Sequence, residues 1–361
     1  MNKSSCIGID LFAGAGGLSL GLSNAGFDMR VGIEKDKYAA STLQQNNPGQ
    51  KVIVEDIHNL KPLTVLKRNG LKASEIDLIA GGPPCQGYSK SNMRSRTVEN
   101  PLNSLYLEYF KFVKSIKPEA FLFENVAGLT LQPYEVQYSE ILKLAKKLGY
   151  NIQSDVIDSH NFGVPQQRKR VLIIGTNQKI DDIFSNETGR SVTTVRDAIS
   201  DLPLVENGNN LDELPYHKNR GLSQYQKKMR KDKGKTVRNN IVTRNSDLIL
   251  ERYKHIPEGG NWENIPPSLM KNYKNPQNCH GWIYYRLKWD RPSVVISNFR
   301  KNMLIHPGYD RGLTVREAAR IQSFPDNYIF YGTKESQQQQ VANAVPPLMA
   351  EEIGKKIIGE L

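Results

Sequence analysis

Hydrophobic and polar positions follow two periods along the first half of the chain, and the pattern predicts strands that alternate with helices. Short apolar runs bounded by turn residues predict seven buried strands, at Cys6–Phe12, Val31–Glu34, Val52–Ile57, Ile76–Ala80, Ala120–Phe123, Tyr150–Ser159 and Arg170–Gly175. Apolar residues at helical spacing predict helices at 18–25, 105–116, 141–148, 313–322 and 347–358. This alternation is typical of an α/β fold built on an open sheet.

The alternation stops near Asn177, where the composition also changes. Lysines and arginines crowd residues 218–238, and aromatic residues interleave with basic ones between 252 and 289. Over 361 residues Lys and Arg outnumber Asp and Glu by 49 to 37, a net charge of +12. This excess indicates a polyanionic partner, nucleic acid before membrane, and bases beside aromatics suit phosphates and base edges. The alternative for 218–238 is a solvated run of like charge.

No segment indicates a membrane span, a secretion signal or a metal site. No apolar run approaches the roughly 20 residues that a membrane-spanning helix needs, and the first residues lack the pattern of a signal peptide. The three cysteines, Cys6, Cys85 and Cys279, have neither CxxC spacing nor a histidine cluster beside them. We therefore expect a protein of a reducing compartment, without disulfides or metal.

A glycine-rich turn follows the first strand. It holds Gly14, Gly16 and Gly17 and leads into a helix, an order in which bare backbone lets a ligand approach the helix N-terminus. Glu34 ends the second strand, where a carboxylate suits ribose hydroxyls, and Asp56 lies at the end of the third. Singly, each acid also fits a helix cap or a solvated loop. Together they indicate an adenosine-containing ligand.

The loop at 81–89 surrounds one cysteine, Cys85, with glycines and prolines after the fourth strand. Proline fixes φ and glycine admits a backbone or ligand, so the thiol sits on an unusual loop where open α/β sheets keep their chemistry. Cys85 is thus a candidate nucleophile. The alternative is a buried small side chain. The basic stretch 88–103 after it either closes over a phosphate backbone or is a disordered connector.

Two further strands contribute polar residues to the same edge. Glu124 and Asn125 follow the fifth strand, and Arg168 and Arg170 alternate where the last strand begins. Side chains two positions apart on an extended segment point to one face, so the arginines would clamp an anion or brace Glu124. Exposed surface charges are the alternative.

With these residues assembled, the chain resembles the bacterial DNA (cytosine-5)-methyltransferases of restriction-modification systems over nearly its whole length. The resemblance rests on eight blocks in the family's order: Asp10–Gly17, Glu34, Asp56–Ile57, Pro83–Gln86, Glu124–Val126, Gln166-x-Arg168-x-Arg170, Thr314–Pro325 and Gln340–Pro346. One block alone is modest evidence, and eight in register are strong evidence.

The resemblance implies a Rossmann-like S-adenosylmethionine-dependent methyltransferase sheet and a second, smaller target-recognition domain. Residues 1–180 would form the catalytic and cofactor-binding domain, 181–312 the DNA-binding domain, and 313–361 a hinge and a C-terminal helix that returns to the catalytic domain. The Cys85 thiolate would attack C6 of a flipped-out cytosine while Glu124 hydrogen-bonds or protonates N3, so that C5 accepts the methyl group.

The family's site residues carry over by position. The implied catalytic set is Cys85, Glu124, Arg168, Arg170, Pro84 and Asn125. Arg168 would orient Glu124 and the base, with Arg170 in support. The implied set for S-adenosylmethionine, which leaves as S-adenosylhomocysteine, is Phe12, Gly14, Gly16, Gly17, Glu34, Asp56, Ile57, Leu105 and Asn343. No metal is implied.

Double-stranded DNA is the expected partner, because the long basic insert between 177 and 285 suits a duplex groove. A related branch of the family methylates cytosine in transfer RNA, which is the nearest alternative, and a regulatory DNA-binding subunit without activity is another. A nicotinamide oxidoreductase would fit only the glycine turn. We expect a cytoplasmic monomer that associates with the bacterial nucleoid through DNA, with a restriction endonuclease encoded nearby as a candidate partner.

Overall fold

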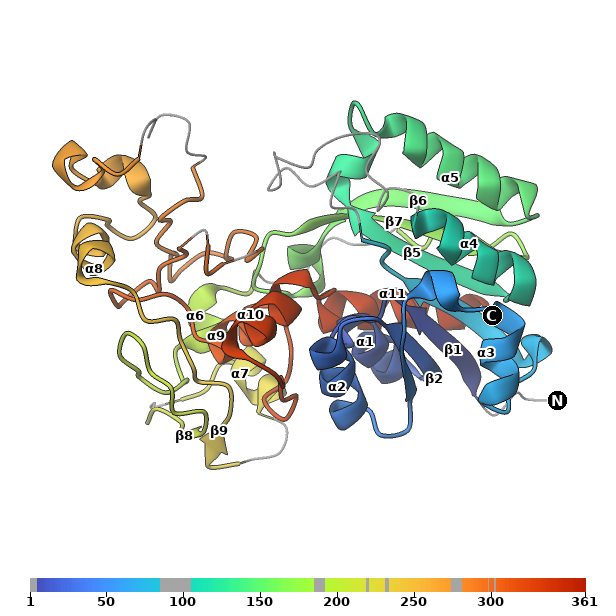
Figure 1. Cartoon of the computed structure of the whole chain (residues 1–361), viewed down its shortest axis with the longest axis horizontal. Coiled ribbons are helices and arrows are strands. Elements are labelled where there is room, and N and C mark those ends of the chain that lie inside the picture. Colours follow the sequence, from blue (N-terminus) through green and yellow to red (C-terminus); the bar gives the residue numbers. More distant parts are fainter. Residues whose placement is uncertain are drawn as a thin grey trace. The chain divides into compact units, whose positions relative to one another are not determined.

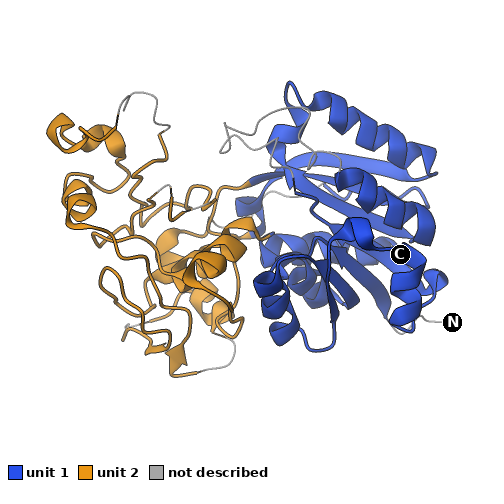
Figure 2. Ribbon diagram, viewed as in Figure 1, with its two compact units in different colours: residues 1–162, 169–189, 345–361 blue, residues 163–168, 190–344 orange. Residues whose placement is uncertain are grey.

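The computed structural model describes residues 5–84, 105–184, 192–218, 221–230, 234–273, 281–297, 299–301 and 303–361. The chain divides into two compact units, coloured blue and orange in Figure 2. Unit 1 comprises residues 1–162, 169–189 and 345–361, and unit 2 comprises residues 163–168 and 190–344. Each unit is therefore assembled from stretches that are separated in the sequence.

Unit 1 is built on a seven-stranded sheet (Figure 1). The strands are β1 (Cys6–Leu11), β2 (Phe27–Glu34), β3 (Lys51–Val54), β4 (Ile76–Gly81), β5 (Ala120–Val126), β6 (Asn151–Asp158) and β7 (Lys169–Thr176). They lie in the order β3-β2-β1-β4-β5-β7-β6. The first five strands are parallel, and β7 runs antiparallel to both neighbours. The predicted α/β sheet is thus confirmed, with a strand in each of the seven predicted places.

Three details of the strands differ from the prediction. β2 begins at Phe27 rather than Val31, because its first half alternates apolar and polar residues and forms no continuous apolar run. β3 ends at Val54 rather than Ile57, since Asp56 accepts the His58 N–H and turns the chain into a short 3-10 helix. β7 begins at Lys169, one residue before the predicted start at Arg170, and ends at Thr176 rather than Gly175.

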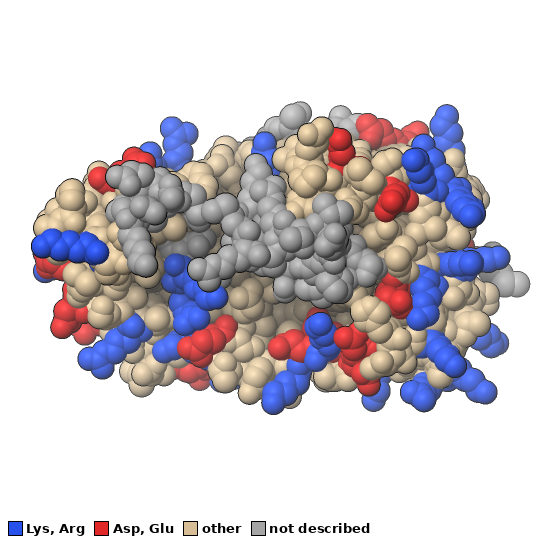
Figure 3. Space-filling model, turned by 45° about the horizontal axis from the view of Figure 1, so that its top comes forward, with Lys and Arg blue, Asp and Glu red and all other residues tan. Residues whose placement is uncertain are grey.

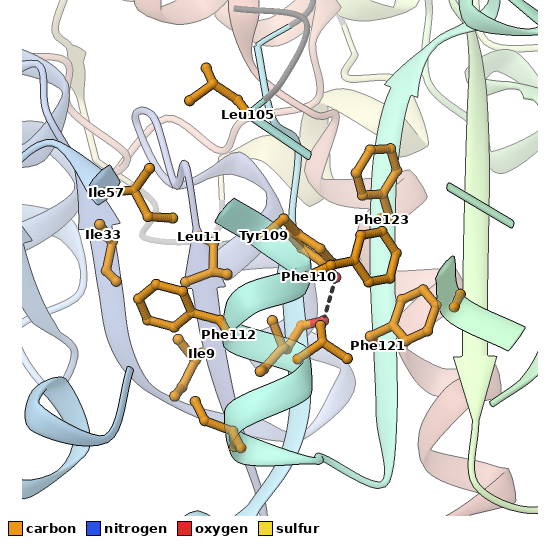
Figure 4. Packing of buried hydrophobic residues seen from close by; sticks show 14 of the residues in the cluster. Ile9, Leu11, Ile33, Ile57, Leu105, Tyr109, Phe110, Phe112, Phe121 and Phe123 are labelled. Atoms are coloured by element: carbon orange, nitrogen blue, oxygen red, sulfur yellow. Dashed lines mark hydrogen bonds between the residues drawn. The ribbon is translucent and has the colours of Figure 1, made fainter. Parts of the chain in front are cut away.

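Helices pack against the sheet of unit 1. They are α1 (Gly17–Ala25), α2 (Lys37–Asn46), α3 (Pro62–Arg68), α4 (Leu105–Ile116), α5 (Glu135–Lys147) and α11 (Pro347–Glu360). Figure 4 shows Ile9 and Leu11 of β1 in one apolar cluster with Phe112 of α4. Because side chains alternate along a strand, Asp10 between them faces the opposite side, where it contacts Ser19 of α1.

The C-terminal helix α11 lies directly against α1. A Cβ added at Gly21 of α1 would collide with Ala350 of α11, and one added at Gly354 would lie 2.7 Å from the Cβ of Ala25. Glycine at both positions therefore permits the close approach of the two helix backbones. The last segment of the chain thereby becomes part of unit 1.

The order of the strands creates a switch point between β1 and β4. The chain runs from β1 outward to β2 and β3 on one side, and from β4 outward to β5 on the other. Leu11 pairs with Gly81, so the carboxyl ends of the two strands are level. Open α/β sheets bind ligands at such a point, outside the carboxyl ends of the strands.

Unit 2 has much less regular structure within its described residues. Its helices are α6 (Val195–Ile199), α7 (Gln224–Met229), α8 (Asp247–Lys254), α9 (Val315–Ile321) and α10 (Lys334–Asn343), and its strands β8 (Leu214–Pro215) and β9 (Thr236–Val237) have two residues each. The capping box predicted for α9 is present: the Thr314 hydroxyl accepts the Glu317 N–H, and the Glu317 carboxylate accepts the Thr314 N–H.

On the face drawn in Figure 3, lysine and arginine side chains are interspersed with aspartate and glutamate. The net positive charge is therefore not gathered into a single patch among the residues coloured on that face. In the described part of the chain, no helix has the length and apolar character needed to cross a membrane.

Candidate active site

The glycine turn after β1 has an unusual backbone. Gly14 and Gly16 have φ angles of 56° and 84°, in the left-handed region that favours glycine. Phe12 also has a positive φ, 60°, which residues with a side chain rarely adopt and which recurs at ligand sites. A Cβ placed on Gly14 would meet no atom within 4 Å. Gly16 caps α1 and Gly17 is its first residue, so the turn leaves open space in front of a helix N-terminus.

Glu34 ties the end of β2 to this turn. Its Oε2 accepts the Gly14 N–H at 2.9 Å, and its Oε1 accepts the Asp36 N–H at 2.7 Å. Burial raises the pKa of Glu34 above its ordinary value, although the two backbone N–H donors oppose the rise. The predicted ribose acid therefore lies beside the turn, as the strand order requires.

Asp56 lies beyond the end of β3 and caps a 3-10 helix. Its Oδ1 accepts the His58 N–H at 3.1 Å and lies 2.7 Å from His58 Nδ1. The backbone N–H of His58 holds the pKa of Asp56 below its ordinary value. The side chain of Asp56 is 41% exposed, whereas Ile57 is buried. The acid thus has a capping role and is still accessible to a ligand.

The residues of unit 1 fit an adenosine-containing cofactor. Open space at Gly14, a carboxylate at Glu34 and an exposed carboxylate at Asp56 provide room and hydrogen-bond acceptors. Leu105, the first residue of α4, is buried in the cluster that Phe12 borders. Asn343 belongs to unit 2, where it ends α10 and accepts a hydrogen bond from Gln339. Its part in the cofactor site stays a prediction.

Glu124 is paired with Arg170. The two residues stand on the antiparallel strands β5 and β7, and Arg170 Nε lies 2.9 Å from Glu124 Oε1. Both side chains are nearly buried, with 10% and 12% of their surface exposed. A guanidinium at this distance fixes the orientation of the carboxyl group through a charge-assisted hydrogen bond. The prediction gave Arg170 a supporting part, and within unit 1 Arg170 contacts Glu124 directly.

Glu124 and Asn125 also contact the backbone that leads to Cys85. A Cβ added at Gly82 would lie 2.7 Å from Glu124 Oε2, so a side chain at position 82 would crowd the carboxylate. Asn125 Nδ2 donates to the Pro83 carbonyl at 3.3 Å. Pro84 is the last described residue before the loop, and Cys85 itself lies outside the described residues. Gly82 is absent from the predicted set of site residues, although the sequence places it among the glycines and prolines of the loop at 81–89.

Arg168 belongs to unit 2 and is anchored there. Its Nη2 donates to the carbonyls of Ala342 and Ala344, both at 3.1 Å, at the end of α10. It is 2% exposed. Its predicted role in orienting Glu124 and the base stays a prediction. Within the described residues, no cluster of three or more potential metal ligands occurs.

The site combines a glycine turn at the switch point, acids at the ends of β2 and β3, and a glutamate held by Arg170 beside Gly82. These features define a nucleotide-cofactor enzyme of the α/β class. Residues 7–359 match the family described as C-5 cytosine-specific DNA methylase. The chain belongs to this family and is a DNA cytosine methyltransferase. The predicted family, fold class and enzyme class are confirmed, and family and fold together indicate S-adenosylmethionine as the methyl donor.

Similar proteins agree with this assignment. The Type II methyltransferase M.DdeI of Desulfomicrobium norvegicum is 36% identical, over 97% of this chain and 88% of its own length. The Type II methyltransferase M1.HphI of Haemophilus parahaemolyticus is 33% identical, over 97% and 86%. A putative DNA modification methyltransferase from a prophage of E. coli has a crystal structure with a TM-score of 0.80 at 28% identity, covering 99% of both chains.

Proposed function

We propose that the chain methylates C5 of a flipped-out cytosine in a specific double-stranded DNA sequence, through a covalent bond between the Cys85 sulfur and C6 of the base. The observation that supports this most directly is the arrangement around Glu124. Arg170 fixes one of its oxygens, Gly82 leaves room for the other, and Asn125 holds the backbone just before Cys85. A carboxyl group is thereby oriented beside the loop that carries the nucleophile.

The residues perform complementary parts of the chemistry. Cytosine C5 is a poor nucleophile, so the Cys85 thiolate adds to C6 while Glu124 hydrogen-bonds or protonates N3. Electron density then gathers on C5, which takes up the methyl group. Loss of the C5 proton expels the thiolate and restores the aromatic ring. The target atom cannot be reached inside a duplex, and base flipping removes that barrier.

S-adenosylmethionine, when bound, supplies a methyl group on a positively charged sulfur. The glycine turn at 14–17 would admit its methionine part, Glu34 would accept from the ribose hydroxyls, and Asp56 would accept from the adenine amine. Phe12, Ile57, Leu105 and Asn343 complete the proposed pocket.

We assign target recognition to residues 181–312, of which 190–312 belong to unit 2. Its basic segment 218–238 suits phosphate contacts, which give affinity without sequence information, while side chains at base edges give specificity. The Type II names of the relatives support a role in restriction-modification, with a cognate endonuclease as partner. We further propose that the protein acts as a monomer on the DNA of a bacterial nucleoid.

Bisulfite sequencing of an unmethylated plasmid tests the proposal. After incubation with the protein and S-adenosylmethionine, protected cytosines should fall in one short sequence context. Complete conversion of every cytosine, with cofactor binding intact, would argue against a duplex DNA substrate, and the same assay on transfer RNA would then test the alternative.

The Cys85→Ser variant tests the covalent step. It should lose nearly all turnover and still bind the cofactor, because a serine hydroxyl is not ionised near neutral pH. Cys6→Ser is the matched control, since Cys6 stands at the start of β1, at the opposite end of that strand from the glycine turn. That control should keep its activity. Substantial methylation by the Cys85→Ser variant would refute the covalent role.

A further inference from the structure

Three buried polar side chains of unit 1, those of Asp10, Ser19 and Gln50, are hydrogen-bonded to one another. Ser19 Oγ donates to Asp10 Oδ2 at 2.6 Å, and Gln50 Nε2 donates to Ser19 Oγ at 3.0 Å. The three residues are 1%, 0% and 3% exposed. Asp10 Oδ1 and Gln50 Oε1 have no hydrogen-bond partner among the described residues. A buried acceptor without a donor costs free energy, so this cluster calls for a reason beyond stability.

The cluster lies beside the glycine turn. Asp10 pairs with Gly32 of β2, and a Cβ on Gly32 would lie 3.1 Å from Gln50 Nε2 and 3.6 Å from the Cβ of Ala13. Ala13, in the turn, donates its N–H to the Ile33 carbonyl at 3.0 Å. The residue after Ile33 is Glu34, which accepts the Gly14 N–H. Asp10 therefore lies on the strand pair that leads to the glycine turn. Its partner Gly32 is close to Ala13 of the turn, and Ala13 precedes Gly14, the hydrogen-bond partner of Glu34.

Among the residues that the structure describes, no positive side chain pairs with Asp10. The charged or titratable groups that act on it are Glu34 at the end of β2 and Tyr109 of α4. Helix α1, to which Asp10 is hydrogen-bonded through Ser19, has no titratable side chain in its sequence GLSLGLSNA. On β4, the acid Asp77 accepts the Ile7 N–H near the opposite end of β1. Burial raises the pKa of Asp10 to about 7, and the charge of Glu34 adds to the rise while the Ser19 hydroxyl opposes it.

A buried acid without a basic partner suits a cationic ligand. S-adenosylmethionine carries a sulfonium charge, and S-adenosylhomocysteine, a thioether, lacks it. We propose that Asp10 is the residue by which this enzyme distinguishes its cationic cofactor from the uncharged-sulfur product, with Ser19 and Gln50 positioning the carboxyl group. This inference rests on the proposed cofactor site of unit 1.

Exchange of product for cofactor is coupled to the protonation of Asp10. Below neutral pH the Asp10 carboxyl is protonated, and it releases that proton when the cationic cofactor binds, because a nearby positive charge favours the ionised form. After methyl transfer the sulfonium charge is gone, and Asp10 takes a proton back. The preference for cofactor over product is therefore present above the pKa of Asp10 and is lost as the pH falls below it.

Calorimetric titration of the full-length protein tests this inference, with S-adenosylmethionine and S-adenosylhomocysteine each measured from about pH 6 to about pH 8.5. With one pKa unit of coupling, the ratio of product Kd to cofactor Kd should rise about fivefold across this range. Near pH 6.5, buffers of different ionisation enthalpy should reveal about half a proton released per cofactor bound and less per product. A ratio that does not change with pH in the wild-type protein would overturn the proposal.

Variants separate charge from structure. Asp10→Asn keeps the shape of the side chain and should make the Kd ratio independent of pH, so the difference from wild type isolates Asp10 from the cofactor's own ionisations. Ser19→Ala should keep the pH dependence and shift its midpoint upward, because the hydroxyl favours the ionised carboxyl. Asp77→Asn, a matched change at another buried acid, should leave the pH dependence as it is.

The outcome also distinguishes this inference from the proposed function. Absence of cofactor binding at every pH would contradict the cofactor site itself. Cofactor binding with a Kd ratio that stays flat in both wild type and Asp10→Asn would contradict only the role of Asp10.

Discussion

The interiors of the two units are built by different means. Unit 1 encloses one large apolar cluster whose members come from the strands and from α3, α4 and α5, including Tyr109, Phe110, Phe112, Phe121 and Phe123. Unit 2 buries a smaller apolar cluster around Tyr253 and Tyr284. Among its described residues, six arginines are at most 6% exposed: Arg168, Arg252, Arg286, Arg311, Arg316 and Arg320. Buried charged side chains therefore help to stabilise the interior of unit 2, whereas the interior of unit 1 is stabilised mainly by apolar packing.

The arginines replace a missing ladder of backbone hydrogen bonds. In unit 1 the strands satisfy one another's carbonyls, whereas long irregular stretches of unit 2 leave carbonyls without such partners. A guanidinium has five N–H donors in a rigid plane and can serve several carbonyls at once. Arg286 donates to the carbonyls of Tyr253, Ile256, His306 and Tyr309 and also to Asp310. One side chain thus holds three loop segments together.

The largest effect should come from removing Arg320 in the Arg320→Leu variant. Arg320 is fully buried between Asp326, which it contacts at 2.5 Å, and Asp201, at 3.2 Å. Breaking a buried ion pair leaves an uncompensated charge, which typically costs about 3–5 kcal/mol. Hydrogen exchange measured by mass spectrometry should show a loss of protection in α6, α7 and α9. Cofactor binding should persist, because the hydrogen-bond and ion-pair partners of Arg320 described above, and the Ala198 carbonyl that it also contacts, all lie in unit 2.

Phe121→Ala provides the comparison in unit 1. Phe121 packs edge to face against Phe110 and Tyr150, and removing its ring should cost a similar amount, about 3–5 kcal/mol. In this variant the loss of protection should fall on β4, β5 and α4, and cofactor binding should weaken. If both variants lost protection over the same residues, the two interiors would not be independent.

The difference between the units also decides what could be predicted from sequence. Apolar runs such as Leu78–Ala80 identify strands of unit 1 because burial on both faces leaves a continuous signal. Acids at strand ends then follow from the order of elements, as Glu34 beside Gly14 illustrates. Neither the antiparallel direction of β7 nor the pairing of Glu124 with Arg170 has a local signal, because both depend on strand order.

In unit 2 the sequence predicts little of the structure. A buried arginine such as Arg316 is indistinguishable in sequence from an exposed one, since its partners are carbonyls of Arg238, Pro325 and Tyr328 that only the fold brings together. Asp10 was overlooked for a related reason. It stands in an apolar strand as part of a recognised block, and its burial without a base becomes visible only when α1 and β2 are in place.

A smaller loss of stability is expected in unit 2 at acidic pH. Burial, together with the charges of Arg311 and Arg286, holds the pKa of His306 at about 4, although Glu317 opposes the shift. The unfolded chain therefore binds a proton more readily than the folded one, so stability is present above the ordinary value of 6.5 and is lost as the pH falls from 6.5 through 4. The loss should reach about 2–3 kcal/mol for unit 2, measured by urea unfolding.

Histidine substitutions identify the source of this acid sensitivity. His306→Gln should flatten the pH dependence of unfolding between 6.5 and 4, and His217→Gln, at an exposed position of the same unit, should not. Glu317 acts in a lower window: burial opposes its ionisation, but Arg311 and His306 hold its pKa at about 2, so its contribution is lost only below its ordinary value of 4.5. An unchanged profile in His306→Gln would assign the sensitivity elsewhere.

The smallest effect should come from an arginine pair at the surface. Arg196 contacts Asp290 at 3.0 Å, a distance comparable with that of the buried Arg320 pairs, but the two side chains are 54% and 80% exposed. Water screens such a pair, so Asp290→Asn should change the free energy of unfolding by less than about 1 kcal/mol. The exposed and the buried arginine–aspartate pairs, at comparable distances, would then differ severalfold in their contribution to the free energy of unfolding. Urea unfolding of Asp290→Asn and Arg320→Leu in parallel measures this difference. A large loss in Asp290→Asn would mean that geometry, rather than burial and the carbonyls of irregular backbone, decides what an arginine contributes to this unit.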